Sequence, residues 1–179
     1  MKALLLNGSP RRGNTKEALE ALKKGFANID DLEITEIVAN DVDVSPCLAC
    51  DNCKSSGSCV FDDDTNAIME QVIKADVLVF ATPVYWWGIS SQMKIIIDKF
   101  YSRTSRLAEC SKQVGVIVVG ELPQDNLQYE LISRQFRCIA DYLGWDMAFC
   151  KTYTAHGPSD LRSDTAAMAE IENLWQEMK

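Results

Sequence analysis

Short apolar runs alternate along the whole chain with longer segments of helical periodicity. Five runs of β-branched or aliphatic residues predict strands, at 2–7, 32–39, 76–83, 113–120 and 145–153. Five longer segments with apolar residues three and four apart predict helices, at 15–28, 62–75, 90–103, 126–144 and from Leu161 onward. We therefore expect strands and helices to alternate from one end of the chain to the other.

The third and fourth apolar runs predict how the elements are layered. VLVF (77–80) and VGVIVV (114–119) have no polar face, so helices are expected to cover both sides of these strands. Right-handed crossovers then give a doubly wound five-stranded parallel sheet in a three-layer α/β/α sandwich, as one domain over 1–179. In such sheets ligands bind beyond the carboxyl ends of the strands. The loops after the first and third strands are therefore the expected site.

Composition narrows the class of protein. The 179 residues carry a net charge of −8 and contain no internal repeat, and a nucleic-acid binder is expected to show a basic face instead. No apolar run approaches the ~18 residues that a membrane span needs. The apolar core of the N-terminus has only four residues, shorter than the apolar region of a signal peptide. We expect a cytoplasmic protein with reduced thiols, bound neither to nucleic acid nor to a membrane.

The loop after the first strand resembles a phosphate-binding loop. Residues 8–15 have the frame G-x-x-x-x-G-N-T, in which Asn14 stands where a P-loop has the lysine that reaches the β- and γ-phosphates. The remaining anion ligands are backbone N–H groups, the start of a helix and the side chains of Ser9, Arg11, Arg12 and Thr15. This set favours a single terminal phosphate over a triphosphate. A plain Ser-Pro turn with an Asn cap is the alternative.

Three adjacent aromatic residues follow the third strand. Tyr85, Trp86 and Trp87 lie between Pro83 and Gly88, where the strand ends. Aromatic residues at this place are equally consistent with a buried core. Beside a phosphate cradle, however, they favour a planar ring system held by backbone atoms and aromatic faces, such as an isoalloxazine.

Together, residues 7–15 (NGSPRRGNT) and 81–100 (ATPVYWWGISSQMKIIIDKF) resemble the NAD(P)H-dependent FMN reductase family of flavodoxin-like proteins, over nearly the whole chain. The resemblance implies FMN as cofactor, with its phosphate bound by Ser9, Arg11, Arg12, Gly13, Asn14 and Thr15. It implies that the flavin ring is lined by Pro83, Val84, Tyr85, Trp86, Trp87 and Gly88. The loop at 120–126 is expected to close over the ring, although it lacks the glycine-rich run of many relatives.

The resemblance also implies an activity. Members pass electrons from NAD(P)H to a small acceptor such as a quinone, free flavin or nitro compound, and are commonly homodimers or higher oligomers with the flavin near the interface, where Trp86 or Trp87 could lie. No catalytic side chain is predicted, because the flavin carries the chemistry. The only histidine, His156, follows the fifth strand and either borders the flavin or is simply exposed. A single histidine leaves no H-E-x-x-H zinc site.

Four cysteines form a second motif between the second strand and the following helix. Cys47, Cys50, Cys53 and Cys59 have the spacing C-x2-C-x2-C-x5-C, too compact for paired zinc knuckles and wrongly placed for a thioredoxin-like pair. Compact runs of this kind are typical of iron–sulfur sites. The pattern is similar to that of the iron–sulfur flavoproteins, which ligate a [4Fe–4S] cluster next to FMN and take electrons from ferredoxin. Cluster-free relatives keep a similar pattern, and the aromatic loop here resembles theirs more closely. A non-enzymatic redox sensor or interaction protein is a third interpretation.

Other polar positions are expected to be structural. Cys110, Cys138 and Cys150 fall in helix or strand patterns and are expected to be buried thiols. The acidic run 62–65 is better explained as a helix start than as a Mg²⁺ site. Lys94 and Asp98, four residues apart on a helix, are expected to form a surface ion pair.

Overall fold

The five apolar runs form one parallel sheet. A computed structural model describes residues 1–178, and its strands have the order β2-β1-β3-β4-β5. Their bounds are β1 Lys2–Asn7, β2 Glu33–Val38, β3 Val77–Pro83, β4 Gln113–Gly120 and β5 Asp146–Thr154. The chain winds outward from β1 in both directions, so the order reverses between β1 and β3. This confirms the predicted doubly wound, flavodoxin-like sheet and places its switch point at the carboxyl ends of β1 and β3.

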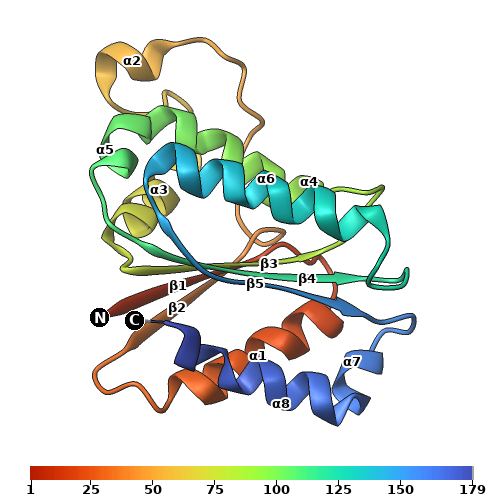
Figure 1. Ribbon diagram of the computed structural model, residues 1–179. Helices are drawn as coiled ribbons and strands as arrows, with labels where there is room; N and C mark the ends of the chain where they lie inside the picture. Colours follow the sequence, from red (N-terminus) through yellow and green to blue (C-terminus); the bar gives the residue numbers. More distant parts are fainter. Residues whose placement is uncertain (179) are drawn as a thin grey trace.

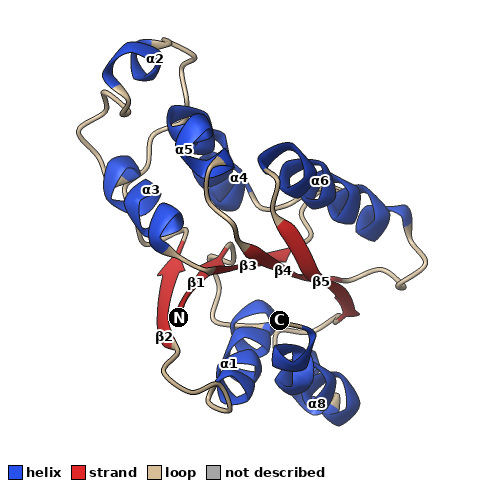
Figure 2. Cartoon of the chain, turned by 60° about the vertical axis from the view of Figure 1, so that its left-hand side comes forward, coloured by secondary structure: helices blue, strands red, loops and turns tan. Residues whose placement is uncertain are grey.

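Two helix layers cover the sheet (Figure 1). One layer contains α1 Asn14–Phe26, α7 Asp160–Ser163, α8 Thr165–Asn173 and the 3-10 turn η2 Leu174–Glu177. The opposite layer contains α3 Thr65–Lys74, α4 Ser91–Asp98, the 3-10 turn η1 Lys99–Arg103, α5 Thr104–Ala108 and α6 Leu127–Leu143. The view in Figure 2 shows both layers on either side of the strands. No helix within residues 1–178 is long and apolar enough to cross a membrane.

The central strand shows why the sheet needs both layers. Every residue of β3 is buried. Leu78 and Phe80 pack into the core beneath α3 to α6, whereas Val77, Val79 and Ala81 pack toward α1 and α8. The alternation follows from the two-residue period of a strand, and it explains why a run without polar residues is needed here.

Four local features differ from the predicted pattern. The helix expected at 90–103 passes into η1 and continues as α5 to Ala108, and the tail is divided into α7, α8 and η2. A short helix, α2 Asn52–Ser56, lies within the four-cysteine segment, where no helix was predicted. Cys138 is exposed, not buried, because α6 turns Ile132, Phe136 and Ala140 toward the sheet and leaves Cys138 on its outer face. Lys94 and Asp98 form the expected surface pair.

Candidate functional site

Four loops meet at the carboxyl edge of the sheet and enclose one cavity of about 580 Å³. This volume lies within the ~300–1,000 Å³ typical of ligand sites. Nine of the predicted cofactor residues line it: Ser9, Arg11, Arg12, Gly13, Asn14, Thr15, Pro83, Val84 and Tyr85. The other lining residues come from the end of β4 and from the loops after β4 and β5: Val119, Gly120, Glu121, Ala155, His156, Gly157 and Pro158. The structure thus brings segments far apart in the sequence around one hollow at the switch point of the sheet.

The loop after β1 is held in shape by its own polar groups. The backbone N–H of Ser9 donates to Asn7 Oδ1 at 3.0 Å, and Ser9 Oγ accepts from the N–H of Arg11 at 3.2 Å. Ser90, at the start of α4, donates from Oγ to the carbonyl of Gly8 at 2.6 Å. The first loop is therefore fixed both locally and to the element that follows β3.

The start of α1 can bind an anion. Its N-cap is Gly13, so among the described residues no side chain caps the helix, and the residues of its start, Gly13, Asn14 and Thr15, line the cavity. The first backbone N–H groups and the positive end of the helix dipole favour negative charge. Arg11 and Arg12 are exposed beside them at the cavity wall. A phosphate monoester fits this arrangement of uncapped N–H groups, hydroxyls and two guanidinium groups.

Asn14 joins the first loop to the last one. Its side-chain Nδ2 donates to the carbonyl of Gly157 at 2.7 Å, and its Oδ1 accepts from the backbone N–H of Leu161 at 3.1 Å. A Cβ on Gly13 would lie 2.9 Å from the carbonyl oxygen of Pro158, so these loops are in direct contact. Because both polar atoms of the Asn14 side chain bind protein groups, its side chain shapes the cradle, and its backbone N–H remains at the helix start.

The aromatic turn divides into an inner and an outer part. Tyr85 and Gly88 exchange two backbone hydrogen bonds of 2.9 and 3.0 Å, which makes a two-residue hairpin with Trp86 and Trp87 at its tip. Both tryptophans have positive φ, +46° and +59°. Trp86 is 92% exposed and Trp87 is 49% exposed. The hairpin turns these rings outward, so Trp86, Trp87 and Gly88 do not line the cavity although the sequence groups them with Tyr85.

The loop after β4 is fastened to β5. The carbonyl of Leu122 accepts from Tyr129 OH at 2.8 Å and from Thr154 Oγ1 at 2.9 Å. Gln124 Nε2 donates to the carbonyl of Thr152 at 3.0 Å. This anchoring leaves Gly120 and Glu121 at the cavity wall, and the exposed His156 faces the same hollow from the next loop. The wall formed by residues 155–158 was missed apart from His156, although position after a parallel strand is a signal that could have found it.

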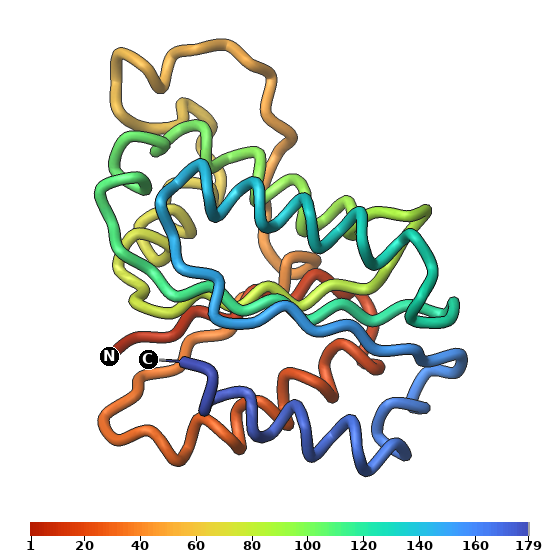
Figure 3. The backbone as a smooth tube through the Cα atoms, viewed as in Figure 1, coloured from red at the N-terminus to blue at the C-terminus, as the bar shows by residue number. Residues whose placement is uncertain are grey.

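The four-cysteine segment lies apart from this cavity. Residues 45–62 stand away from the sheet, beyond α3 and α5 (Figures 1 and 3). Cys47, Cys50, Cys53 and Cys59 line a small cavity against η1, which shares no lining residue with the larger one. Within residues 1–178, no three Cys, His, Asp or Glu side chains converge as metal ligands. A metal centre bound by all four thiols would therefore require the side chains to move closer together, including those of Cys47 and Cys50, which are exposed.

Two aspartates hold the ends of this segment together. Asp63 accepts from the backbone N–H of Ser45 at 2.9 Å and from that of Thr65 at 2.9 Å, and Asp64 accepts from the N–H of Asp43 at 2.8 Å. Burial acts to raise the pKa of Asp63, but hydrogen bonds from Thr65 and Ser45 and the charge of Lys99 hold that pKa below its usual value. The acidic run therefore holds the two ends of the segment together by hydrogen bonds, in addition to starting α3.

The fold and the cavity define a flavodoxin-like α/β protein. The model of the NADPH-dependent FMN reductase family matches residues 1–137, and the chain belongs to this family. The structure is similar to that of the Trp repressor binding protein from Bacillus subtilis, with a TM-score of 0.65 and 24% identity over 97% of this chain and 98% of the other. It is also similar to an NADH:FMN oxidoreductase in its apo form, with a TM-score of 0.68 and 18% identity over 98% and 86% of the two chains.

Curated relatives divide into two kinds. An iron–sulfur flavoprotein from Methanocaldococcus jannaschii is 34% identical over 127 residues, which are 67% of this chain and 62% of the relative. An iron–sulfur flavoprotein from Archaeoglobus fulgidus is 32% identical over 66% of this chain and 54% of the relative. The chain thus spans about six-tenths or less of the length of these two relatives. The Bacillus subtilis protein YwqN, which is named as an NAD(P)H-dependent FMN-containing oxidoreductase, is 25% identical over 97% of this chain and 96% of its own.

Proposed function

We propose that this protein is an FMN-dependent oxidoreductase that passes electrons from NAD(P)H to a small acceptor such as a quinone, a free flavin or a nitro compound. The observation that carries the proposal is the cavity at the switch point, which joins the uncapped start of α1 to an aromatic wall at Tyr85. When bound, FMN supplies the redox chemistry. The family to which the chain belongs supports the same cofactor.

The chain's own residues would bind and orient the cofactor. Ser9, Thr15 and the first N–H groups of α1 would hold the phosphate, with Arg11 and Arg12 neutralising its charge. Pro83, Val84 and Tyr85 would pack against the ring at the end of β3. Asn14 would keep the loops after β1 and β5 together, so that the cradle exists before the ligand arrives. The exposed tryptophans of the hairpin would contact the acceptor or a second copy of the chain in a homodimer.

Anaerobic mixing of the FMN-loaded protein with NADH and with NADPH tests this function. We expect the absorbance of the oxidised flavin to disappear with at least one nicotinamide, because hydride transfer to the bound flavin reduces it. Stopped-flow absorbance measures the rate, and free FMN at the same concentration is the control. Loss of the absorbance with dithionite but with neither nicotinamide would contradict the proposal and favour a protein electron donor.

An iron–sulfur flavoprotein fed by ferredoxin is the second candidate. A specific observation favours it: the four cysteines line one cavity together with Lys99, a lysine that is only 2% exposed. The thiols suit an iron–sulfur cluster by their chemistry and number, and relatives of this name match the chain. In this case Cys47, Cys50, Cys53 and Cys59 would bind a [4Fe–4S] cluster, which would supply one-electron transfer.

Protein purified without oxygen distinguishes the two candidates. With a cluster, we expect about four iron and four sulfide per chain, and a serine at any one of the four cysteines should abolish the cluster absorbance while FMN remains bound. The matched control is Cys138→Ser, a cysteine exposed on α6 outside the segment. Less than one iron per chain after anaerobic reconstitution would contradict the iron–sulfur candidate and leave the cluster-free oxidoreductase as the remaining one.

A further inference from the structure

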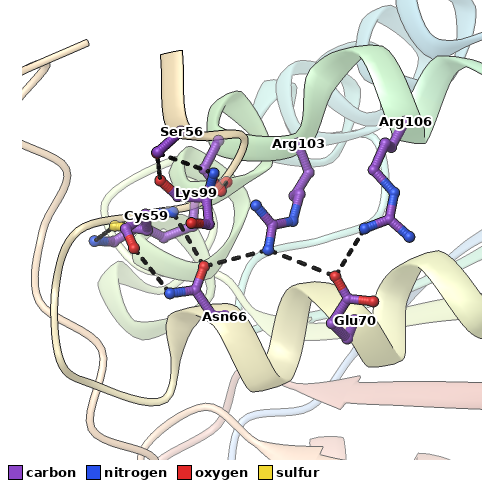
Figure 4. A network of polar contacts seen from close by, with 9 residues as sticks. Ser56, Cys59, Asn66, Glu70, Lys99, Arg103 and Arg106 are labelled. Carbon is purple, nitrogen blue, oxygen red and sulfur yellow. Dashed lines mark hydrogen bonds and ion pairs between the residues drawn. The ribbon is translucent and has the colours of Figure 1, made fainter. Parts of the chain in front are cut away.

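Two cations of η1 are buried beneath the four-cysteine segment. Lys99 is 2% exposed and Arg103 is 8% exposed, although both belong to residue types that are almost never fully buried without a partner. They lie four residues apart; Lys99 lies beside Cys59, and Arg103 points to Asn66 and Glu70 (Figure 4). Neither cation lines the larger cavity, so the proposed FMN site does not account for their burial.

Lys99 reaches the sulfur of Cys59. Its Nζ lies 3.6 Å from Cys59 Sγ and 4.3 Å from the centroid of the Phe61 ring. Among residues 1–178, no carboxylate lies within ion-pair distance of this ammonium. A cysteine sulfur is a weak acceptor, so this contact alone is a poor partner for the buried ammonium.

Arg103 approaches the same cysteine through Asn66. The side chain of Asn66 binds the backbone of Cys59 on both sides, accepting from its N–H at 3.0 Å and donating to its carbonyl at 2.8 Å. Arg103 Nη2 lies 3.5 Å from Asn66 Oδ1 and 3.5 Å from Glu70 Oε1. Its Nε and Nη1 are buried and have no partner among the described residues. Glu70 is also bound by Arg106 at 2.9 Å, so one carboxylate serves two guanidinium groups.

The anionic neighbours of the two cations are either more distant or shared: the charge of Lys99 acts on Asp63 beyond ion-pair distance, and Glu70 serves both Arg103 and Arg106. A buried cation whose anionic partner is distant or shared is destabilising, and further negative charge beside it would relieve this cost. Four thiolates around an iron–sulfur cluster would bring that charge, and hydrogen bonds to the sulfurs together with nearby charge set the potential of such a centre.

We propose that Lys99 is the counter-cation of the cysteine segment and donates an N–H···S hydrogen bond to Cys59, which raises the reduction potential of the centre bound there. The proposal rests on the second candidate function. Lys99 is a positioning residue, because it acts through the cysteine ligand. Its ammonium favours the more negative, reduced form of the centre, so its removal makes reduction harder.

The variant Lys99→Met keeps the length of the side chain and removes its charge. In anaerobically reconstituted protein, a redox titration followed by the spectroscopic signal of the reduced cluster should show the reduction equilibrium at least tenfold less favourable. For one electron this is a fall of about 59 mV or more in midpoint potential. Lys99→Arg should restore most of the potential, since it returns a cation and donors to the same place.

Two control lysines separate this effect from general damage. Lys112→Met removes the other lysine that is 2% exposed, which donates to the carbonyls of Ile73 and Ala75 at 2.9 and 2.5 Å. Lys74→Met removes an exposed lysine at the end of α3. Both variants should keep the wild-type midpoint. If Lys99→Met does not fold, Lys99→Gln provides a second neutral variant, for which we expect a fall in the same direction.

The outcomes distinguish the two proposals. A Lys99→Met protein with wild-type iron and sulfide content and an unchanged midpoint would overturn the role of Lys99 and leave the cluster intact. A wild-type protein that takes up neither iron nor sulfide would overturn both. If the wild type and Lys99→Arg take up iron and sulfide but Lys99→Met does not, the result would support the proposal in a stronger form. FMN affinity should stay at the wild-type value throughout, because the two cavities share no residue.

Discussion

Asn14→Asp should weaken FMN binding by about 100-fold, or about 2.8 kcal/mol at 1.4 kcal/mol for each factor of ten. The change is isosteric, yet it has two effects on the cradle. A carboxylate cannot donate to the carbonyl of Gly157, so the bond between the loops after β1 and β5 is lost. The new negative charge also lies at the start of α1, where the phosphate would bind. A fluorescence titration with FMN measures the loss.

The same variant should keep its folding stability within about 1 kcal/mol. An acidic residue in the first turn of a helix is favourable by ~0.3–1 kcal/mol, which offsets part of the lost hydrogen bond. The matched control is Asn28→Asp, which also removes an amide donor to a carbonyl, that of Gly25, at the opposite end of α1. It should not change FMN affinity. A folded Asn14→Asp protein with affinity within about twofold of wild type would contradict the cradle.

The strands could be predicted from the sequence because their signal is local. In β3 and β4 uninterrupted apolar residues are enough to indicate a strand covered on both faces. Helix ends were less well predicted where no capping signal marks the boundary. No breaker separates Asp98 from Lys99, so the pattern reads as one helix, whereas the backbone tightens into η1 there and continues into α5.

Only part of the candidate site could be predicted from the sequence, because only part of its signal is local. The first loop has a phosphate-binding frame that can be recognised within eight residues. The bond that completes the cradle joins Asn14 to Gly157, 143 residues away, and no pattern in either loop indicates it. Burial of Lys99 and Arg103 is equally invisible in the sequence, because charged residues on a helix face ordinarily predict a solvated surface.

The aromatic turn lies at the end of β3, as the sequence predicts, but only one of its three rings, that of Tyr85, lines the cavity. The sequence places Tyr85, Trp86 and Trp87 together beside the proposed ring site. The hairpin bond between Tyr85 and Gly88 then separates them, because a two-residue loop turns its central side chains outward. Such a turn ordinarily has Asn-Gly at its centre, since both central residues need positive φ. Two tryptophans occupy these positions instead.

Replacing both tryptophans by the residues that the turn prefers, Trp86→Asn with Trp87→Gly, should stabilise the fold. A bulky residue in the left-handed region costs about 1–2 kcal/mol, so relief at two positions contributes about 2–4 kcal/mol. The two rings lie 6.1 Å apart between centroids, and losing their contact subtracts about 0.5–1.5 kcal/mol. We expect a net increase of about 0.5–3.5 kcal/mol in the free energy of unfolding, measured by chemical denaturation of the apo protein.

The gain in stability should come with a loss of function, because local backbone strain persists where the strained residues are used. Trp86, 92% exposed, can stabilise this fold very little through burial, so a contact with an acceptor or a second copy of the chain is the remaining account of its presence. We expect the double variant to lose oligomerisation, measured by sedimentation, or to show a higher KM for the acceptor. The control Tyr142→Asn removes an aromatic ring that is 75% exposed on α6 without positive φ, and it should change neither property nor raise stability. A double variant that is more stable and fully active would mean that the tryptophans contribute nothing to offset their strain.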